Sequence, residues 1–286
     1  MKKMLSLMIV CIFVFGGFTV SARNSRPNLP YTTAYFDDDA PEWQVGDTWT
    51  YKIDSIIVDY DQSGQKILID GSIDDFTWKV TDTSGDYYTV SISGKLTATY
   101  DIYLASQTLT LHLVGSFKPT LTRLVGVIQF TKSSLQVHDI SLQLKGISSA
   151  KINSIPFSIP LFFKLVTEGD LSDDFPLLVF PMSTPKLWNM PDLQLAMSST
   201  FGGLFGLIQI PFTVGVHYSF IPFAFICLNK EDVTVGAGTF NAYKITSLIG
   251  DYFEYYYAPT VGNIVKFDVI LTNGEAHGEL KSTNYQ

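Results

Sequence analysis

Alternation of apolar and polar residues over positions 88–104, YTVSISGKLTATYDIYL, restricts the possible folds of this chain more than any other feature. A two-residue period is typical of a β-strand with one buried face. The 17 residues would extend about 56 Å at about 3.3 Å each, which is too long for one flat strand. Gly94 lies in the apolar series and predicts a bend or bulge that curls the sheet around something.

Neighbouring segments alternate in the same way, and two of them change phase by one residue. The changes fall at Asp74-Asp75 and at His138-Asp139, and shifts of one residue are typical of β-bulges. Ser84-Gly85-Asp86 suits a hairpin turn, and the short gaps between segments favour antiparallel pairing. We therefore expect an all-β protein: a large, strongly curved antiparallel sheet (a half-barrel or clam) with few short helices.

The N-terminus predicts export. Lys2 and Lys3 precede the apolar run Met4–Phe15, and Val20-Ser21-Ala22 ends in a small residue, so residues 1–22 are predicted to be a signal peptide. An uncleaved membrane anchor is the alternative, but the run is shorter than the roughly 20 residues that a membrane span needs. Since no N-x-S/T glycosylation sequence occurs, we expect a prokaryotic cell envelope or extracellular location.

Residues 23–42 are predicted to form a flexible leader, because they combine prolines and acidic residues without periodicity. Residues 43–286 are predicted to form a single β domain. Within it, a proline-rich apolar insert is expected at about 150–200, with stretches such as SIPFSIPLFF and FPLLVFPMSTPKLW. Proline is excluded from central strands, so these stretches predict edge or loop segments that cover the core or form the rim of a binding mouth.

Charge and cysteine content exclude some classes of function. Without residues 1–22, two of the 19 basic residues are lost, which leaves 17 against 27 acidic residues and a net charge of −10. This disfavours nucleic acid as a partner and electrostatic docking on anionic lipid. Cys227 is then the single cysteine, so stability must come from a hydrophobic core. Charged residues make up only 16% and aromatic residues 14%, which favours β-structure with large apolar faces.

Residues 193–229 contain no Asp, Glu, Lys or Arg in 37 positions. Their two-residue alternation, together with Pro211 and Pro222, argues against a transmembrane helix. Two interpretations remain: the aromatic face packs inward on a core or a ligand, or it faces lipid in an outer-membrane β-barrel. Under the first interpretation the candidate ligand-binding residues are Phe212, Val214, Val216, Tyr218, Phe220, Phe223 and Phe225.

Residue patterns of known catalytic and metal sites were not found. The four histidines, His112, His138, His217 and His277, are scattered without ligand spacing. Cys227 lies in Phe-Ile-Cys-Leu, which favours a buried, inert thiol. We therefore predict no catalytic residue, metal or cofactor. An enzyme would be favoured only if distant acids such as Asp139, Glu231 and Glu254 met in one cleft.

Two C-terminal motifs carry a resemblance to a known family. They are Gly238-Thr239-Phe240-Asn241-Ala242-Tyr243-Lys244-Ile245 and the segment 255–266, YYYAPTVGNIVK. Together they resemble the final hairpin of β-clam envelope proteins, the group that includes the outer-membrane lipoprotein carriers, and WQVGDTWTY at 43–51 is similar to their first strand. The resemblance implies a strongly curved antiparallel sheet, open on one side, that wraps an apolar interior.

The leading hypothesis is an exported, non-catalytic envelope protein whose curved sheet binds or shields an apolar, lipid-like ligand. The hypothesis rests on the large apolar area of the chain. Each Phe or Leu side chain that is buried contributes roughly 1.5–3 kcal/mol of free energy, so apolar faces favour burial in a core or against a ligand. Peripheral membrane contact fits the same hypothesis. The alternatives are a surface or structural interaction protein with no small ligand, and an outer-membrane β-barrel. The sequence does not specify the oligomeric state.

Overall fold

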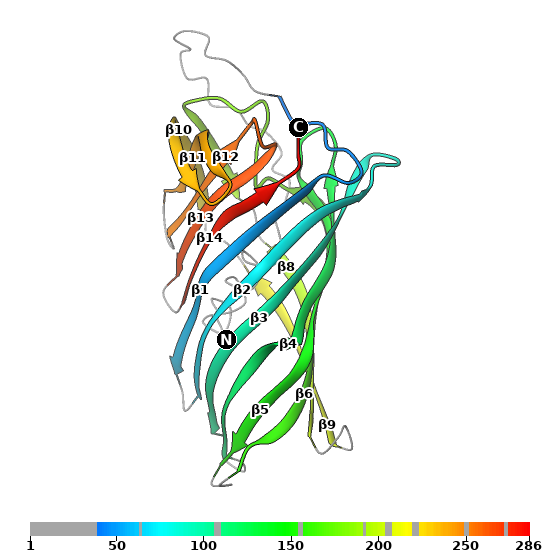
Figure 1. Ribbon diagram of the computed structural model, residues 1–286, viewed down its shortest axis with the longest axis vertical. Coiled ribbons are helices and arrows are strands. Elements are labelled where there is room, and N and C mark those ends of the chain that lie inside the picture. Colours follow the sequence, from blue (N-terminus) through cyan, green and yellow to red (C-terminus); the bar gives the residue numbers. More distant parts are fainter. Residues whose placement is uncertain are drawn as a thin grey trace.

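The computed structural model of the chain is a single antiparallel sheet (Figure 1). It describes residues 39–62, 65–105, 110–153, 157–190, 193–203, 208–218, 223–248, 252–271 and 274–286. The predicted all-β class and the large curved sheet are confirmed. The expectation of a few short helices is wrong for the described residues, which contain none. The predicted signal peptide and most of the predicted leader lie outside them.

Fourteen strands make up the sheet, and every pairing between neighbours is antiparallel. The strands are β1 (Thr48–Gln62), β2 (Gln65–Asp82), β3 (Tyr87–Ala105), β4 (Thr110–Thr131), β5 (Val137–Ile152), β6 (Ile159–Phe175), β7 (Lys186–Met190), β8 (Leu193–Gly203), β9 (Ile208–Tyr218), β10 (Phe223–Val235), β11 (Gly238–Ser247), β12 (Tyr252–Ala258), β13 (Asn263–Leu271) and β14 (Gly274–Thr283).

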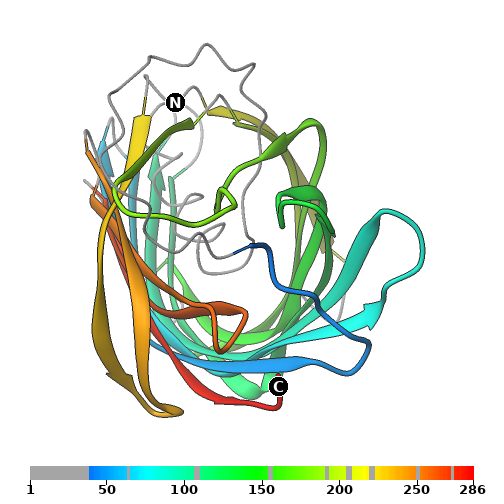
Figure 2. The ribbon, with the colours of Figure 1, turned by 90° about the horizontal axis from the view of Figure 1, so that it is seen from above.

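Their order across the sheet is β7-β10-β11-β12-β13-β14-β1-β2-β3-β4-β5-β6-β8-β9. Long strands β1–β6 form a tall curved wall, and the shorter strands β10–β14 continue it at one end (Figure 1). Seen from above, the wall curls round on itself (Figure 2). Within the described residues the edges β7 and β9 are not paired with each other, so the sheet stays open.

The predicted phase change at Asp74-Asp75 is a β-bulge. The register of β2 against β3 shifts between Asp74 and Thr77, opposite Gly94. Asp75 has a φ of 52°, a left-handed conformation that extends the bulged strand by one residue. A Cβ at Gly94 would lie 2.8 Å from Ile73 Cγ2, so the glycine leaves room for the bulge. The predicted bend is therefore confirmed, with the irregular backbone on the strand opposite Gly94.

The second predicted phase change is also a bulge, since the register of β4 against β5 shifts where His138 lies between Val137 and Asp139. The predicted turn at residues 84–86 is confirmed by the hairpin between β2 and β3, where Gly85 has a φ of 66°. In the two C-terminal motifs, Gly238 and Gly262 likewise have positive φ, as expected for turns. The sequence therefore predicted the positions of these bulges and turns correctly.

Alternation along each strand separates an apolar face from a polar one. On β3 the apolar series from Tyr88 to Tyr100 is buried, whereas Ser93, Lys95 and Thr97 between its members are exposed. Buried residues of β1–β5 and β10–β14 join one hydrophobic cluster, to which β3 contributes the alternate residues Tyr88, Val90, Ile92, Leu96 and Ala98 from one side of the sheet. We call this side the inner face and the opposite side the outer face. No helix in the described part is long and apolar enough to cross a membrane.

Candidate functional site

Residues 176–185, which connect β6 to β7, cover the inner face at one end of the sheet (Figure 2, yellow-green). Leu177, Leu178 and Met182 are buried in the large hydrophobic cluster, together with Trp43 and Trp188. We name this cluster the loop-end core. The apolar, proline-rich loop expected from the sequence is therefore tucked over the core, whereas the other proline-rich stretch, around Pro160, is part of strand β6.

Hydrogen bonds attach the loop to the sheet. The Tyr255 hydroxyl donates to the carbonyl oxygen of Leu177 at 2.6 Å, and the Tyr243 hydroxyl donates to that of Met182 at 3.0 Å. Trp188 Nε1 donates to the carbonyl oxygen of Pro176 at 3.0 Å. Buried carbonyl oxygens need hydrogen-bond donors. These aromatic side chains supply donors to three carbonyl oxygens of the loop, which would otherwise be buried without a partner.

A second, smaller hydrophobic cluster occupies the inner face at the opposite end, far from the loop. We name it the far-end cluster. Its buried members are Tyr100, Ala150 and Leu161. Six more apolar side chains pack against them and stay only partly buried: Ile69, Ile102, Leu113, Phe117, Ile152 and Ile159. Most hydrophobic residues of the loop-end core are thus buried, whereas the far-end cluster has more partly buried than buried members, and Ile69 and Phe117 pack against both clusters.

Small residues allow the aromatic rings of the far-end cluster to lie across the strands. A Cβ at Gly115 would be 2.5 Å from Tyr100 Oη, so the tyrosine ring passes directly over this glycine. Tyr100 and Phe117 have ring centroids 4.9 Å apart, and Phe117 and Phe163 have centroids 4.6 Å apart. Strand β5 lies between β4 and β6 and contributes Ser148 beneath this aromatic row. The rings of Tyr100, Phe117 and Phe163 thus form a row on strands β3, β4 and β6.

The predicted ligand-binding residues Phe212, Val214, Val216 and Tyr218 lie on the edge strand β9. They are in register with Ser199, Met197, Leu195 and Leu193 of β8. Phe163 pairs with Phe201 of β8, which pairs with Ile210 of β9, two residues before Phe212. Because alternate positions share a face, these four positions belong to the same face of the sheet as Phe163 and the far-end cluster. Their contact with a ligand remains a prediction.

The last three predicted positions have other environments. Phe220 lies outside the described residues, and Phe223 begins β10, in register with Met190. Phe225 is fully buried in the loop-end core, with its ring centroid 5.6 Å from that of Tyr255 and 6.1 Å from that of Phe253. Phe225 therefore fills the core rather than lining the partly exposed surface.

Cys227, two residues further along β10, is buried as predicted. Burial raises the pKa of its thiol to about 12, because the charged thiolate is poorly solvated there. A thiol with this pKa is almost entirely protonated near neutral pH and is a weak nucleophile. The environment is that of an inert core residue.

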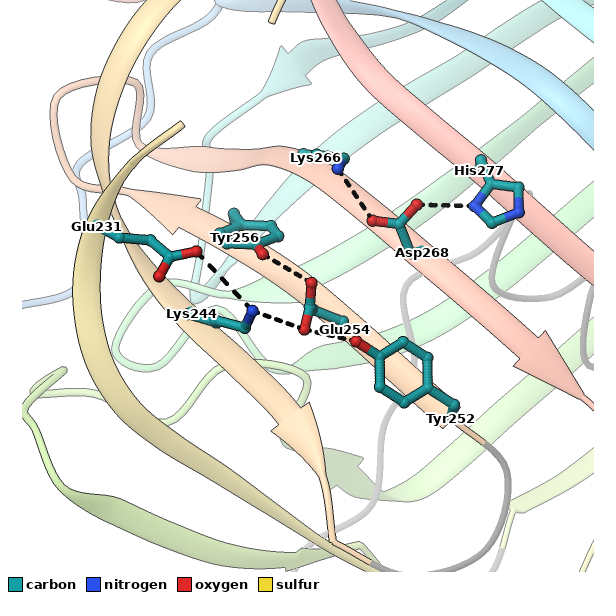
Figure 3. A network of polar contacts seen from close by, with 8 residues as sticks. All are labelled: Glu231, Lys244, Tyr252, Glu254, Tyr256, Lys266, Asp268 and His277. Carbon is teal, nitrogen blue, oxygen red and sulfur yellow. Dashed lines mark hydrogen bonds and ion pairs between the residues drawn. The ribbon is translucent and has the colours of Figure 1, made fainter. Parts of the chain in front are cut away.

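The outer face of β10–β12 carries a network of ionic contacts (Figure 3). Lys244 Nζ lies 2.9 Å from Glu254 Oε2 and 3.8 Å from Glu231 Oε1. The hydroxyls of Tyr252 and Tyr256 each donate to an oxygen of Glu254 at 2.6 Å. Burial alone would raise the pKa of Glu254, but these hydrogen bonds and Lys244 outweigh it and lower the pKa. The group is internally satisfied, which favours a structural role in joining three strands.

A neighbouring set continues this network onto β13 and β14 (Figure 3). Asp268 accepts a contact from Lys266 at 3.3 Å and one from His277 Nδ1 at 2.7 Å. His112 is similarly paired with Asp101 at 2.8 Å, and His138 stacks on Tyr87 with 4.3 Å between ring centroids. The side chain of His217 is outside the described set.

The three acidic residues whose meeting in one cleft would have favoured an enzyme do not all lie together. Glu231 and Glu254 both contact Lys244, but Asp139 lies on β5, and six strands stand between β5 and β12 in the sheet. Within the described ranges, no three His, Cys, Asp or Glu side chains are grouped so that they could hold a metal ion.

Sequence reasoning missed the far-end cluster as a site. Its residues were visible as the inner series of β3 and as apolar alternation elsewhere, but nothing in the sequence separated them from the sealed part of the core. The one local signal was the set of small residues, Gly115, Ser148 and Ala150, that alternate on two strands which pair here.

Comparisons with protein-family models, curated proteins and solved structures found no match to this chain.

Proposed function

We propose that the protein is an exported, non-catalytic envelope protein that binds an apolar, lipid-like ligand on the inner face of its curved sheet, at the far-end cluster. The observation that carries the proposal is the difference between the two ends. Residues 176–185 cover the inner face at the loop end, whereas six apolar side chains of the far-end cluster are only partly buried. Partly exposed apolar surface that gathers in one place is typical of a binding site for an apolar molecule.

The apolar area that a ligand covers sets the scale of its binding free energy. A ligand that covers about 200 Å² of apolar surface would gain about 5 kcal/mol at about 25 cal/mol per Å². Part of this gain is offset by the loss of ligand freedom on binding. The inner face of β1–β5 carries no charged side chain among its described positions, so no ionic group has to be desolvated. The resemblance of the C-terminal hairpin to β-clam carriers supports the same function.

A second candidate function, an interaction protein without a small ligand, is favoured by exposed apolar residues on strands β7, β10, β12 and β13. Tyr252 and Ile270 are paired across β12 and β13 and are 41% and 45% exposed. Leu187 and Leu228 are exposed on β7 and β10. Such residues could bind another protein or the surface of a membrane.

Extraction of the purified protein, residues 23–286, with organic solvent tests the proposal. We expect a co-purifying lipid by mass spectrometry, and we expect added lipid to raise the thermal midpoint of the emptied protein. Leu113→Gln and Ile152→Gln, which alter a cross-strand pair of the far-end cluster, should weaken lipid binding at least tenfold. Val127→Gln on the outer face is the matched control and should bind normally. A clean extract together with an unchanged midpoint would refute lipid binding.

A further inference from the structure

Six hydroxyl and indole groups of the loop-end core donate to backbone carbonyl oxygens, whereas Trp78 Nε1 has no partner in the described part of the chain. Tyr51 donates to Ile264, Trp43 to Gly262 and Trp49 to Val261, at 2.8–2.9 Å, in addition to the three bonds to the loop. Each of these donors has one proton and one acceptor, so its hydrogen-bonding capacity as a donor is used.

The far-end cluster differs, because its hydroxyls bond to each other. Tyr100 Oη lies 2.9 Å from Ser148 Oγ, and either oxygen can be the donor. Two hydroxyls carry two protons, but only one proton can lie between the two oxygens. Neither group forms another hydrogen bond within the described residues. One proton of this buried pair is therefore left without an acceptor, whichever way the bond is oriented.

A third hydroxyl, that of Thr122, belongs to a residue of β4 that is paired with β5 near Ser148. Thr122 pairs with Gly146, two residues before Ser148 on β5. It is fully buried, and its Oγ1 has no partner in the described part of the chain. The other buried side-chain atoms without a partner there, Trp78 Nε1 and Asn263 Nδ2, lie at the loop end. An unsatisfied buried polar group is costly, so its presence needs an explanation.

For the Tyr100–Ser148 pair, an acceptor brought by a ligand provides that explanation. A buried carboxylate or phosphate would require a cation, and the inner face of β1–β5 has none at its described positions. A plain hydrocarbon would leave the hydroxyl protons unpaired. We infer that the ligand of the proposed function is an uncharged acyl ester, whose ester oxygen accepts from the Tyr100–Ser148 pair while its chain covers the aliphatic residues of the far-end cluster. This inference rests on the proposed lipid-binding function.

The pair makes an unusual mutational prediction. In Tyr100→Phe the Ser148 proton is free to donate to the ligand, and in Ser148→Ala the Tyr100 proton is free. Each single variant therefore keeps one donor and should keep most of the preference for an ester. The double variant has no donor and should lose the preference. Two residues that only stabilised the fold would instead contribute to the thermal midpoint without changing the choice of ligand.

Displacement of a bound pyrene-labelled hydrocarbon measures this preference in residues 23–286, with methyl hexadecanoate, an alkane of equal length and the hexadecanoate anion as competitors. We expect the wild type and both single variants to bind the ester about fivefold more tightly than the alkane, and the double variant to bind them equally. The double variant Thr50→Val/Thr77→Val removes a hydroxyl pair elsewhere, with oxygens 3.3 Å apart, and should behave as wild type.

The outcomes separate the two proposals. Equal binding of ester and alkane by the wild type, an ester preference that survives in the double variant, or tightest binding of the anion would overturn the ester assignment and leave lipid binding intact. If neither the labelled probe nor any competitor binds, the proposed function fails and the ester assignment fails with it. Thermal melting of each variant shows whether the fold is retained.

Discussion

At the scale of single residues, the buried tyrosines join parts of the chain that the sheet alone would not hold together. Tyr255 is fully enclosed in the loop-end core, and its hydroxyl reaches the carbonyl of Leu177 across 78 residues of sequence. One hydrogen bond of this kind contributes about 1 kcal/mol net, and the carbonyl left behind by its removal costs more if it stays dry.

Tyr255→Phe should therefore lower the free energy of unfolding by about 1–2 kcal/mol at pH 7, because the Leu177 carbonyl loses its donor. Urea unfolding followed by tryptophan fluorescence measures the change. Tyr103→Phe is the control: Tyr103 is 38% exposed, and its substitution should change stability by less than about 0.5 kcal/mol. Equal effects of the two substitutions would show that the loop contact does not stabilise the fold.

At the scale of an element, the bulge in β2 is held by a residue in a conformation that L-amino acids rarely adopt. Asp75 has a φ of 52°, and its carboxylate lies 2.7 Å from Lys281 Nζ on β14. Asp tolerates the left-handed region better than most residues, whereas a β-branched side chain does not. The ion pair is about half exposed, so its contribution is small.

Substitutions at this position separate backbone strain from charge. Asp75→Val should destabilise the protein by about 1–3 kcal/mol, since valine is strained at this φ. Asp75→Gly loses the same ion pair but relaxes the backbone, so its effect should be smaller than about 1 kcal/mol in either direction. Thermal or urea unfolding of both variants decides the matter: if Asp75→Gly is as destabilised as Asp75→Val, the ion pair and not the φ is responsible.

At the scale of the whole molecule, several ionisable side chains are buried on the inner face in their uncharged form. Burial raises the pKa of Tyr51, Tyr255 and Cys227, the last to about 12. In the unfolded chain tyrosine ionises near pH 10 and cysteine near pH 8.5. A group whose pKa is raised by folding contributes stability that is complete below its unfolded pKa and is lost as the pH rises through its folded pKa.

Stability should accordingly be level up to about pH 8.5 and then fall, by about 1.4 kcal/mol per pH unit for each buried group that ionises only on unfolding. Urea midpoints between pH 7 and pH 11 measure this fall. The deficit of Tyr255→Phe relative to the wild type should shrink above pH 10, because the variant has one such group fewer. A deficit that is constant with pH would contradict the assignment of Tyr255 as a buried, neutral group.

Much of the architecture was readable from the sequence. The two-residue period from Tyr88, the phase changes at Asp74-Asp75 and His138-Asp139, and the turn at Gly85 are local properties, and each was confirmed in the fold. Steric rules act on neighbouring residues, so a strand face, a bulge or a tight turn is encoded where it occurs. The buried state of Cys227 followed from its apolar neighbours in the same way.

The tertiary structure alone decided which apolar faces are sealed and which stay partly open. Phe225 and the far-end residues look alike in sequence, but Phe225 lies beneath the core rings at the loop end, while Leu113 and Ile152 are only partly buried. Likewise, the Tyr100–Ser148 pair unites residues 48 positions apart through the register of β3, β4 and β5. Burial depends on what the rest of the chain places over a strand, and strand periodicity carries no information about that covering.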